Sequence, residues 1–124
     1  PDSARPPSWS TLEREAQLFR AARDAENTRS FGAAHRAYAE LERERESRTI
    51  AEMARLGLAR IGTAARDALL AARTSATRNA RDAELALGDA VAEFSGTPFE
   101  RDLAAALGHL RDDGRFPTLV PRGE

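Results

Sequence analysis

Apolar residues recur three or four positions apart through most of the chain, and this spacing constrains its fold more than any other feature. Such spacing places an apolar stripe on one face of an α-helix, whereas a half-buried strand would alternate apolar and polar residues. No segment shows a period-2 run of β-branched residues. Ala supplies 26 of the 124 residues, and Leu, Ile, Val and Phe together supply only 22. Because Ala favours helices and lets their axes approach closely, we predict an all-α protein with a thin core.

Start and stop signals divide this pattern into about six helices, paired as three antiparallel αα-hairpins. The expected helices cover residues 10–27, 31–46, 48–61, 64–73, 78–94 and 98–113.

Capping residues support two of these boundaries. Ser10 and Glu13 form a capping box at the start of the first helix. Thr97, Pro98 and Glu100 supply an N-cap, a proline and an acid for the start of the last helix, and Gly114 ends it.

The boundary at Gly62 is open to two interpretations. The helix before it has an apolar set formed by Ile50, Met53, Leu56, Leu58 and Ile61. Gly62 and Thr63 predict a stop and restart, but a lone Gly costs a helix only about 1 kcal/mol. One long helix over residues 48–73 is therefore the alternative.

The domain organisation follows from these elements. Residues 1–9 are expected to be a linker, 10–113 a single helical domain and 114–124 a C-terminal tail. The tail contains Leu-Val-Pro-Arg-Gly at 119–123, which resembles the thrombin site of an expression tag, with native sequence as the alternative. A chain that begins with Pro1 is expected to be processed or part of a larger precursor. No run is long and apolar enough for membrane insertion, and the cellular compartment stays open.

Few residues could carry chemistry. Cys is absent, and His35 and His109 are the only imidazoles, neither of them in a metal-binding motif. Asp112 and Asp113 are adjacent on a helix and so point to different faces, which is poor geometry for acid–base work. No phosphate loop or nucleophile motif is present. We therefore predict no metal, no cofactor and no enzymatic activity.

The charges separate along the second half of the chain. Residues 55–81 contain six Arg and one acid, Asp67, whereas residues 82–102 contain six acids and one base, Arg101. Neighbouring helices could pair these charges at the surface. Alternatively, a basic face meets an acidic partner, or two copies stack head-to-tail through opposite faces. A sequence pI near 6.2 and the lack of aromatic residues in the basic stretch argue against nucleic acid as that partner.

Spacings within the three hairpins resemble the tetratricopeptide repeat, over residues 12–113. The matching residues are Leu18-x2-Ala21-Ala22-x2-Ala25 with Ala34-x3-Tyr38, Met53-x2-Leu56-Gly57 with Ala68-x3-Ala72, and Leu87-Gly88-x2-Val91 with Leu103-x3-Leu107. The second repeat departs from the family by placing Arg60 at a Tyr position, and the third by placing Glu84 at the first large position. A non-repeating helical bundle is the alternative.

The resemblance implies a concave surface lined by the first helix of each hairpin. Residues that it directs into this groove include Arg20, Arg23, Arg55, Leu58 and Asp89. We therefore predict a non-catalytic interaction module that binds a partner protein or peptide. The alternative is a structural bundle that forms a homodimer or spaces an anchor or catalytic domain.

Overall fold

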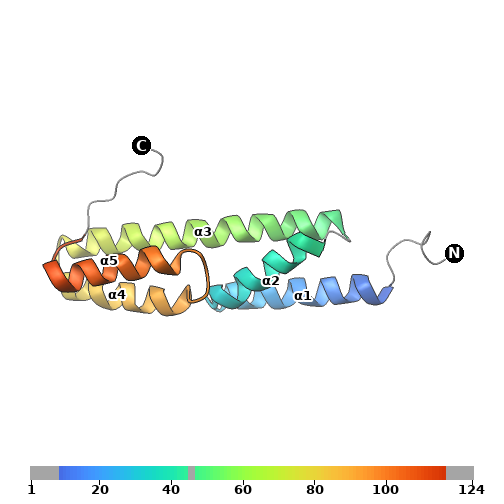
Figure 1. Ribbon diagram of the computed structural model, residues 1–124, viewed down its shortest axis with the longest axis horizontal. Coiled ribbons are helices and arrows are strands. Elements are labelled where there is room, and N and C mark those ends of the chain that lie inside the picture. The colour runs from blue at the N-terminus through green and yellow to red at the C-terminus, as the bar shows by residue number, and fades with distance from the viewer. Residues whose placement is uncertain (1–8, 45–46, 117–124) are drawn as a thin grey trace. The chain divides into compact units, whose positions relative to one another are not determined.

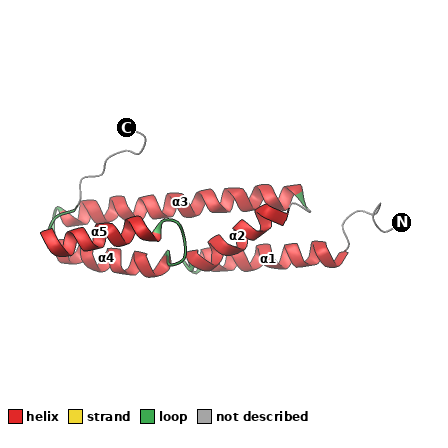
Figure 2. Cartoon of the chain, viewed as in Figure 1, coloured by secondary structure: helices red, strands yellow, loops and turns green. Residues whose placement is uncertain are grey.

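The computed structural model describes residues 9–44 and 47–116, and all regular secondary structure in these ranges is helical (Figure 2). This result confirms the all-α prediction. Residues 1–8 of the predicted linker and residues 117–124 of the predicted tail lie outside the described residues, whereas Trp9 begins the first helix. The helices are α1 (Trp9–Asn27), α2 (Phe31–Glu44), α3 (Arg48–Ala76), α4 (Ala80–Glu93) and α5 (Glu100–Asp113).

The predicted number of six helices in three hairpins is wrong, because residues 48–61 and 64–73 belong to the single helix α3. Gly62 does not end the helix. Its cost of about 1 kcal/mol is small beside the burial of Ile61 and Ala65, which continue one buried stripe across it. The helix also passes the predicted break at Thr74, whose hydroxyl donates to the Leu70 carbonyl at 3.1 Å. Two hairpins remain, α1–α2 and α4–α5 (Figure 1).

Contacts divide the chain into two compact units, residues 1–62 and 63–124, called here the first and second unit. The border falls at Gly62, inside α3, where the sequence left a helix end and one continuous helix as alternatives. The glycine therefore marks a change in packing partners and leaves the helix itself unbroken.

In the first unit, α1 and α2 form a hairpin joined by a tight turn. The Thr28 hydroxyl donates to the Asp24 carbonyl at 3.1 Å, and Arg29 adopts a positive φ of 61°. These features end α1 and reverse the chain. The buried apolar residues of the hairpin are Ala22, Phe31, Ala34, Tyr38 and Leu41.

The face that α3 buries in the first unit differs from its predicted apolar set. Leu56 is 62% exposed and Met53 is 38% exposed. Small residues take their place, since Ala51 and Ala54 are buried and Gly57 lies directly against the Tyr38 ring. Small side chains let two helices approach closely, so side-chain volume decides which residues of α3 are buried here more than hydrophobicity does.

In the second unit, α4 and α5 form the other hairpin. Asn79 caps α4, and its side chain accepts hydrogen bonds from the backbone N–H groups of Arg81 and Asp82. Gly114 ends α5 in the left-handed conformation, φ 68°, as the sequence predicted. The core residues of this hairpin include Leu87, Phe94, Leu103, Leu107 and Leu110.

Two predicted helix starts need correction. α5 begins at Glu100 and not at Thr97 or Pro98, because the residues before it form turns. Thr97 and Glu100 still form side-chain contacts near this start: the Thr97 hydroxyl accepts from the Phe99 N–H at 3.1 Å, and the Glu100 carboxylate accepts from the Gly96 N–H at 3.0 Å. α1 begins at Trp9, so Ser10 lies within its first turn.

Candidate functional site

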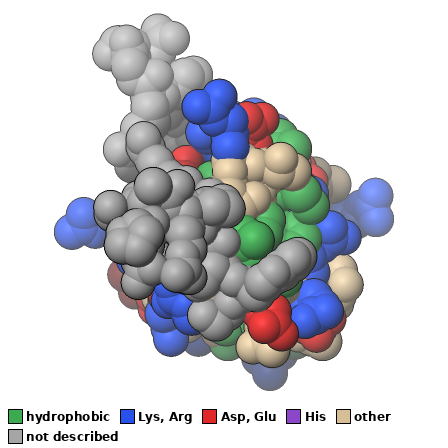
Figure 3. All heavy atoms as spheres, turned by 90° about the vertical axis from the view of Figure 1, so that its right-hand side faces the viewer, with side chains coloured by type: hydrophobic (Ala, Val, Ile, Leu, Met, Phe, Trp, Pro, Cys, Tyr) green, Lys and Arg blue, Asp and Glu red, His purple; other side chains and the backbone are tan. Residues whose placement is uncertain are grey.

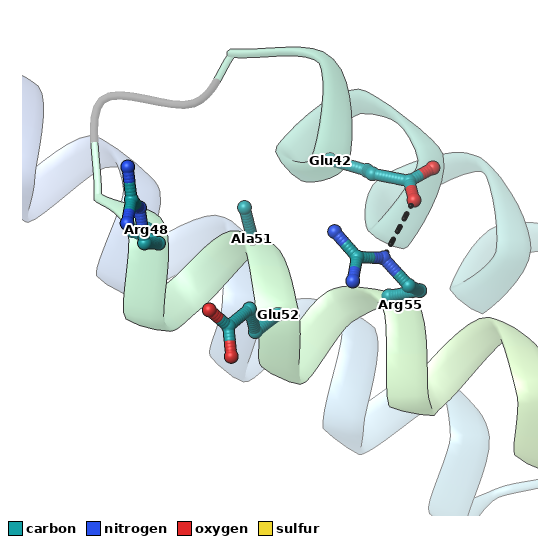
Figure 4. A pocket seen from close by; sticks show the side chains of 5 residues that line it. All are labelled: Glu42, Arg48, Ala51, Glu52 and Arg55. Carbon is teal, nitrogen blue, oxygen red and sulfur yellow. Dashed lines mark hydrogen bonds and ion pairs between the residues drawn. The ribbon is translucent and has the colours of Figure 1, made fainter.

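A groove in the first unit runs between the end of α2 and the start of α3, with a volume of about 400 Å³. Arg48, Ala51 and Arg55 are spaced i, i+3 and i+7, so they share the side of α3 that faces α2 (Figure 4). Glu42 reaches across from α2, and Glu52 completes the lining. The groove therefore has a small apolar floor at Ala51 and walls of both charges.

One ion pair crosses this groove. Arg55 Nε lies 3.3 Å from Glu42 Oε2, and the two side chains are 67% and 37% exposed. An ion pair this open to water contributes at most about 1 kcal/mol. Both groups can therefore exchange this contact for one with a bound partner at little cost.

A three-residue cluster holds α3 against the α1–α2 hairpin beside the groove. The Tyr38 hydroxyl of α2 donates to Glu26 Oε1 of α1 at 2.6 Å. Arg60 of α3 donates to both carboxylate oxygens of Glu26, at 2.7 and 3.0 Å. One polar residue from each helix of the first unit thus meets at Glu26. This paired contact fixes the rotation of α3, and with it the side that faces α2.

The environment of this cluster shifts the acidities of its members. The hydrogen bonds from Arg60 lower the pKa of Glu26 below its usual value, against the opposing effect of burial. Burial, together with the hydrogen bond to Glu26, raises the pKa of Tyr38 to about 12. The hydrogen bonds to Glu26 raise the pKa of Arg60. At neutral pH the cluster therefore consists of a carboxylate, a neutral phenol and a guanidinium.

Close packing between α2 and α3 sets the width of this region. A Cβ atom placed on Gly57 would lie 2.6 Å from Cε2 and Cζ of the Tyr38 ring. Only a residue without a side chain lets the α3 backbone approach the ring this closely. Gly57 therefore brings α3 near enough for Arg60 to reach Glu26.

The structure separates the residues that the sequence predicted for partner binding. Arg55 lies in the groove, whereas Leu58 is half-buried on α3. Arg20 and Arg23 are exposed on α1, and Arg23 lies near enough to Glu26 to contribute to its lowered pKa. Asp89 is exposed on α4 in the second unit.

Sequence reasoning missed the other charged residues that line the groove, which are Glu42, Arg48 and Glu52. Glu42 and Arg48 belong to a mixed-charge run at residues 40–48, a pattern typical of a solvated helix end, whereas Glu52 lies outside this run. Only the packing of α2 on α3 turns that run into a groove wall.

The two imidazoles lie on different helices, His35 on α2 and His109 on α5, where His109 lines a pocket with Asp113. Burial lowers the pKa of His35. His109 Nε2 lies 3.2 Å from Asp113 Oδ2, and its Nδ1 lies 3.2 Å from the carbonyl of Arg115. Within residues 9–44 and 47–116, no three His, Asp or Glu side chains gather where they could hold a metal ion.

Three residues of the oppositely charged segments, Arg55, Arg60 and Glu84, pair with residues outside the other segment. Arg55 and Arg60 pair with Glu42 and Glu26, which precede both segments. Glu84 of the acidic segment pairs with Arg111 at 3.2 Å. On the face drawn in Figure 3, which looks onto the starts of α1 and α3 in the first unit, basic and acidic side chains lie around apolar ones.

Compared with known protein families, curated proteins and solved structures, the chain matches none. None of the helices in the described part of the chain is both long enough and apolar enough to cross a membrane.

Proposed function

We propose that the chain is a non-catalytic interaction module, and that the groove between α2 and α3 binds a segment of a partner protein. The observation that carries this proposal is the lining of the groove. Arg48 and Arg55 stand about 10 Å apart along α3, with Ala51 as a shallow floor between them. This arrangement suits an extended peptide that presents carboxylates to the two arginines.

The exposed ion pair across the groove supports the same function. The Glu42–Arg55 pair is exposed, so a peptide carboxylate can replace Glu42 at Arg55. The hydrogen bonds among Glu26, Tyr38 and Arg60 hold α1, α2 and α3 together. The backbone is therefore positioned before binding, and only long side chains must reorient.

The experiment is a comparative affinity capture from cells of the source organism. The bait is the wild-type chain, the groove variant Arg48→Glu/Arg55→Glu, or the control Arg66→Glu/Arg73→Glu. The control changes the same charges at the same i, i+7 spacing on the same helix. A protein retained by wild type and control but lost with the groove variant is the expected result. Equal retention by all three baits, or capture of nothing, refutes the groove as the binding site.

The tetratricopeptide-like groove implied by the sequence makes a separate prediction for α1. If its first helices line the binding surface, then Arg20→Glu/Arg23→Glu also abolishes capture. Retention by this variant together with loss by the groove variant assigns binding to the α2–α3 groove alone.

Self-assembly is the second candidate function, because the second unit leaves Leu70 38% exposed and Leu85 59% exposed. Static light scattering over a range of concentrations separates the two functions. A chain that stays monomeric excludes self-assembly and leaves partner capture.

A further inference from the structure

Two exposed leucines of the second unit lie on different helices, Leu70 on α3 and Leu85 on α4 (Figure 1). Each is the last residue of the same short sequence, Arg-Asp-Ala-x-Leu, at residues 66–70 and 81–85. Arg66, Asp67, Arg81 and Asp82 of these segments are exposed. Each leucine is thus the apolar centre of a charged helix surface.

The α3 surface is net basic. Arg66 and Asp67 lie one turn before Leu70, at i−4 and i−3, and Arg73 lies one turn after it, at i+3. In a right-handed helix, i−4 and i+3 fall on one side of the central residue and i−3 falls on the other. Arg66 and Arg73 therefore flank Leu70 on one side, and Asp67 lies on the opposite side.

The α4 surface is net acidic. Arg81 and Asp82 precede Leu85 at i−4 and i−3, and Asp89 follows it at i+4. By the same geometry Asp82 and Asp89 flank Leu85 on one side, with Arg81 on the other. The two surfaces thus carry paired charges of opposite sign on opposite sides of the central leucine.

The charges of these two surfaces are not used elsewhere in the described part of the chain. No ion pair or side-chain hydrogen bond in that part of the chain involves the charged group of any of six residues on these surfaces. The residues concerned are Arg66, Asp67, Arg73, Arg81, Asp82 and Asp89.

We propose that the second unit binds a second copy of this chain, with the α3 surface of one copy packed parallel to the α4 surface of the other. Two helices that face each other in parallel bring the left side of one against the right side of the other. Leu70 then packs on Leu85, and every charge meets its opposite. The complementary pairs across the contact are Arg66 with Asp82, Asp67 with Arg81, and Arg73 with Asp89.

The antiparallel arrangement fails the same test. It sets Asp67 against Asp89 and Arg73 against Arg81, and it forms none of the three complementary pairs. Like charges placed opposite each other oppose association and select orientation. The charge pattern therefore specifies both the partner and the direction of the contact.

The two surfaces differ, so the contact is heterologous. Each copy offers one α3 surface and one α4 surface, and further copies can add at either end. The observable consequence is an average mass that keeps rising with protein concentration. This inference does not depend on the groove of the first unit.

Charge reversal and mixing test the proposal. Sedimentation equilibrium is measured for wild type, for Arg66→Glu/Arg73→Glu, for Asp82→Arg/Asp89→Arg, and for an equimolar mixture of the two variants. Each variant alone is expected to associate at least about tenfold more weakly than wild type. The mixture is expected to regain association, because each reversed surface then meets a reversed counterpart.

Two controls separate association from folding and from the proposed groove. Asp82 lies in the first turn of α4, where an acid favours the helix, so circular dichroism must show unchanged helicity. Asp89→Arg alone serves as a second variant that avoids the helix end. The groove variant Arg48→Glu/Arg55→Glu is expected to associate as wild type does. A monomeric wild type, a mixture that stays dissociated, or equal loss in the groove variant overturns the proposal.

The orientation has its own test. Asp67→Arg is expected to weaken association, because the parallel contact sets it against Arg81, whereas the antiparallel contact would set it against Asp89 and be strengthened. Asp67→Arg/Arg81→Asp in the same chain is expected to restore association. Failure of the double variant to recover refutes the parallel arrangement.

Discussion

Replacing Gly57 with Ala tests the packing that brings α3 against α2. The new Cβ would lie 2.6 Å from two carbons of the Tyr38 ring and 2.8 Å from a third. Carbon atoms in favourable contact lie about 3.5–4.0 Å apart, so about 1 Å must be gained by movement. The ring cannot move freely, because its hydroxyl is bonded to Glu26 at 2.6 Å.

The magnitude follows from two opposing effects. Ala in place of Gly within a helix stabilises by about 1 kcal/mol. Overpacking costs about 1–3 kcal/mol, and disturbing a hydrogen bond to a charged group adds about 1.5 kcal/mol. We therefore expect the free energy of unfolding of Gly57→Ala to fall by about 1.5–3.5 kcal/mol.

Gly88→Ala and Gly108→Ala are matched controls. Both glycines lie inside helices, and a Cβ at either position meets nothing within 4 Å. Each control should therefore gain up to about 1 kcal/mol. Urea denaturation followed by circular dichroism at a helix band measures all three, and the m-values show whether the unfolding transition is unchanged.

A double variant isolates the clash itself. With Tyr38→Leu in the background the ring is gone, so the added Gly57→Ala should be neutral or stabilising. A Gly57→Ala protein as stable as Gly88→Ala would refute the close approach of α3 to Tyr38.

Two further predictions concern the cluster at Glu26. Glu26→Gln should lower the free energy of unfolding by about 1–2 kcal/mol at neutral pH, since it removes a charged acceptor from Arg60. The folded-state pKa of Glu26 is depressed, so this contribution is present above the unfolded pKa near 4.5 and is lost as pH falls through the folded value. Urea titrations of both proteins between about pH 7 and pH 3 should converge at the acidic end, and a constant difference would refute the ionised contact. Tyr38→Phe tests the alkaline range. The pKa of Tyr38 is raised from 10.0 to about 12. The contribution of its hydroxyl to folding stability is therefore full below pH 10 and is lost as pH rises toward 12. The phenylalanine variant should lose less stability than wild type over that interval, and parallel alkaline profiles would contradict this.

The two proposals place separate tasks on one helix. Arg48 and Arg55 of α3 line the groove of the first unit, and Arg66 and Arg73 of the same helix belong to the charged surface of the second. Because each pair has the same spacing and charge, each double reversal is the control for the other. Loss of capture without loss of self-association, or the reverse, assigns each function to its own unit.

The sequence by itself determined the helical class and most helix ends. Local effects were sufficient for this: Ala-rich segments favour helices, and Gly114 stops one because it adopts a positive φ at no steric cost. The turn at residues 28–30 and the contacts of Thr97 with the start of α5 were also readable from short-range patterns. Where local signals were weak, as at Gly62, the sequence left two alternatives.

Only the tertiary structure decided which side of each helix is buried. On α3 the larger side chains Met53 and Leu56 are exposed, while Ala51, Ala54 and Gly57 are buried. A hydrophobicity pattern ranks residues by transfer free energy, but the closeness of α2 makes side-chain volume the deciding quantity. The same packing assembled the groove from residues that the sequence presented as a solvated helix end, and it left the charged surfaces of α3 and α4 free to meet another molecule.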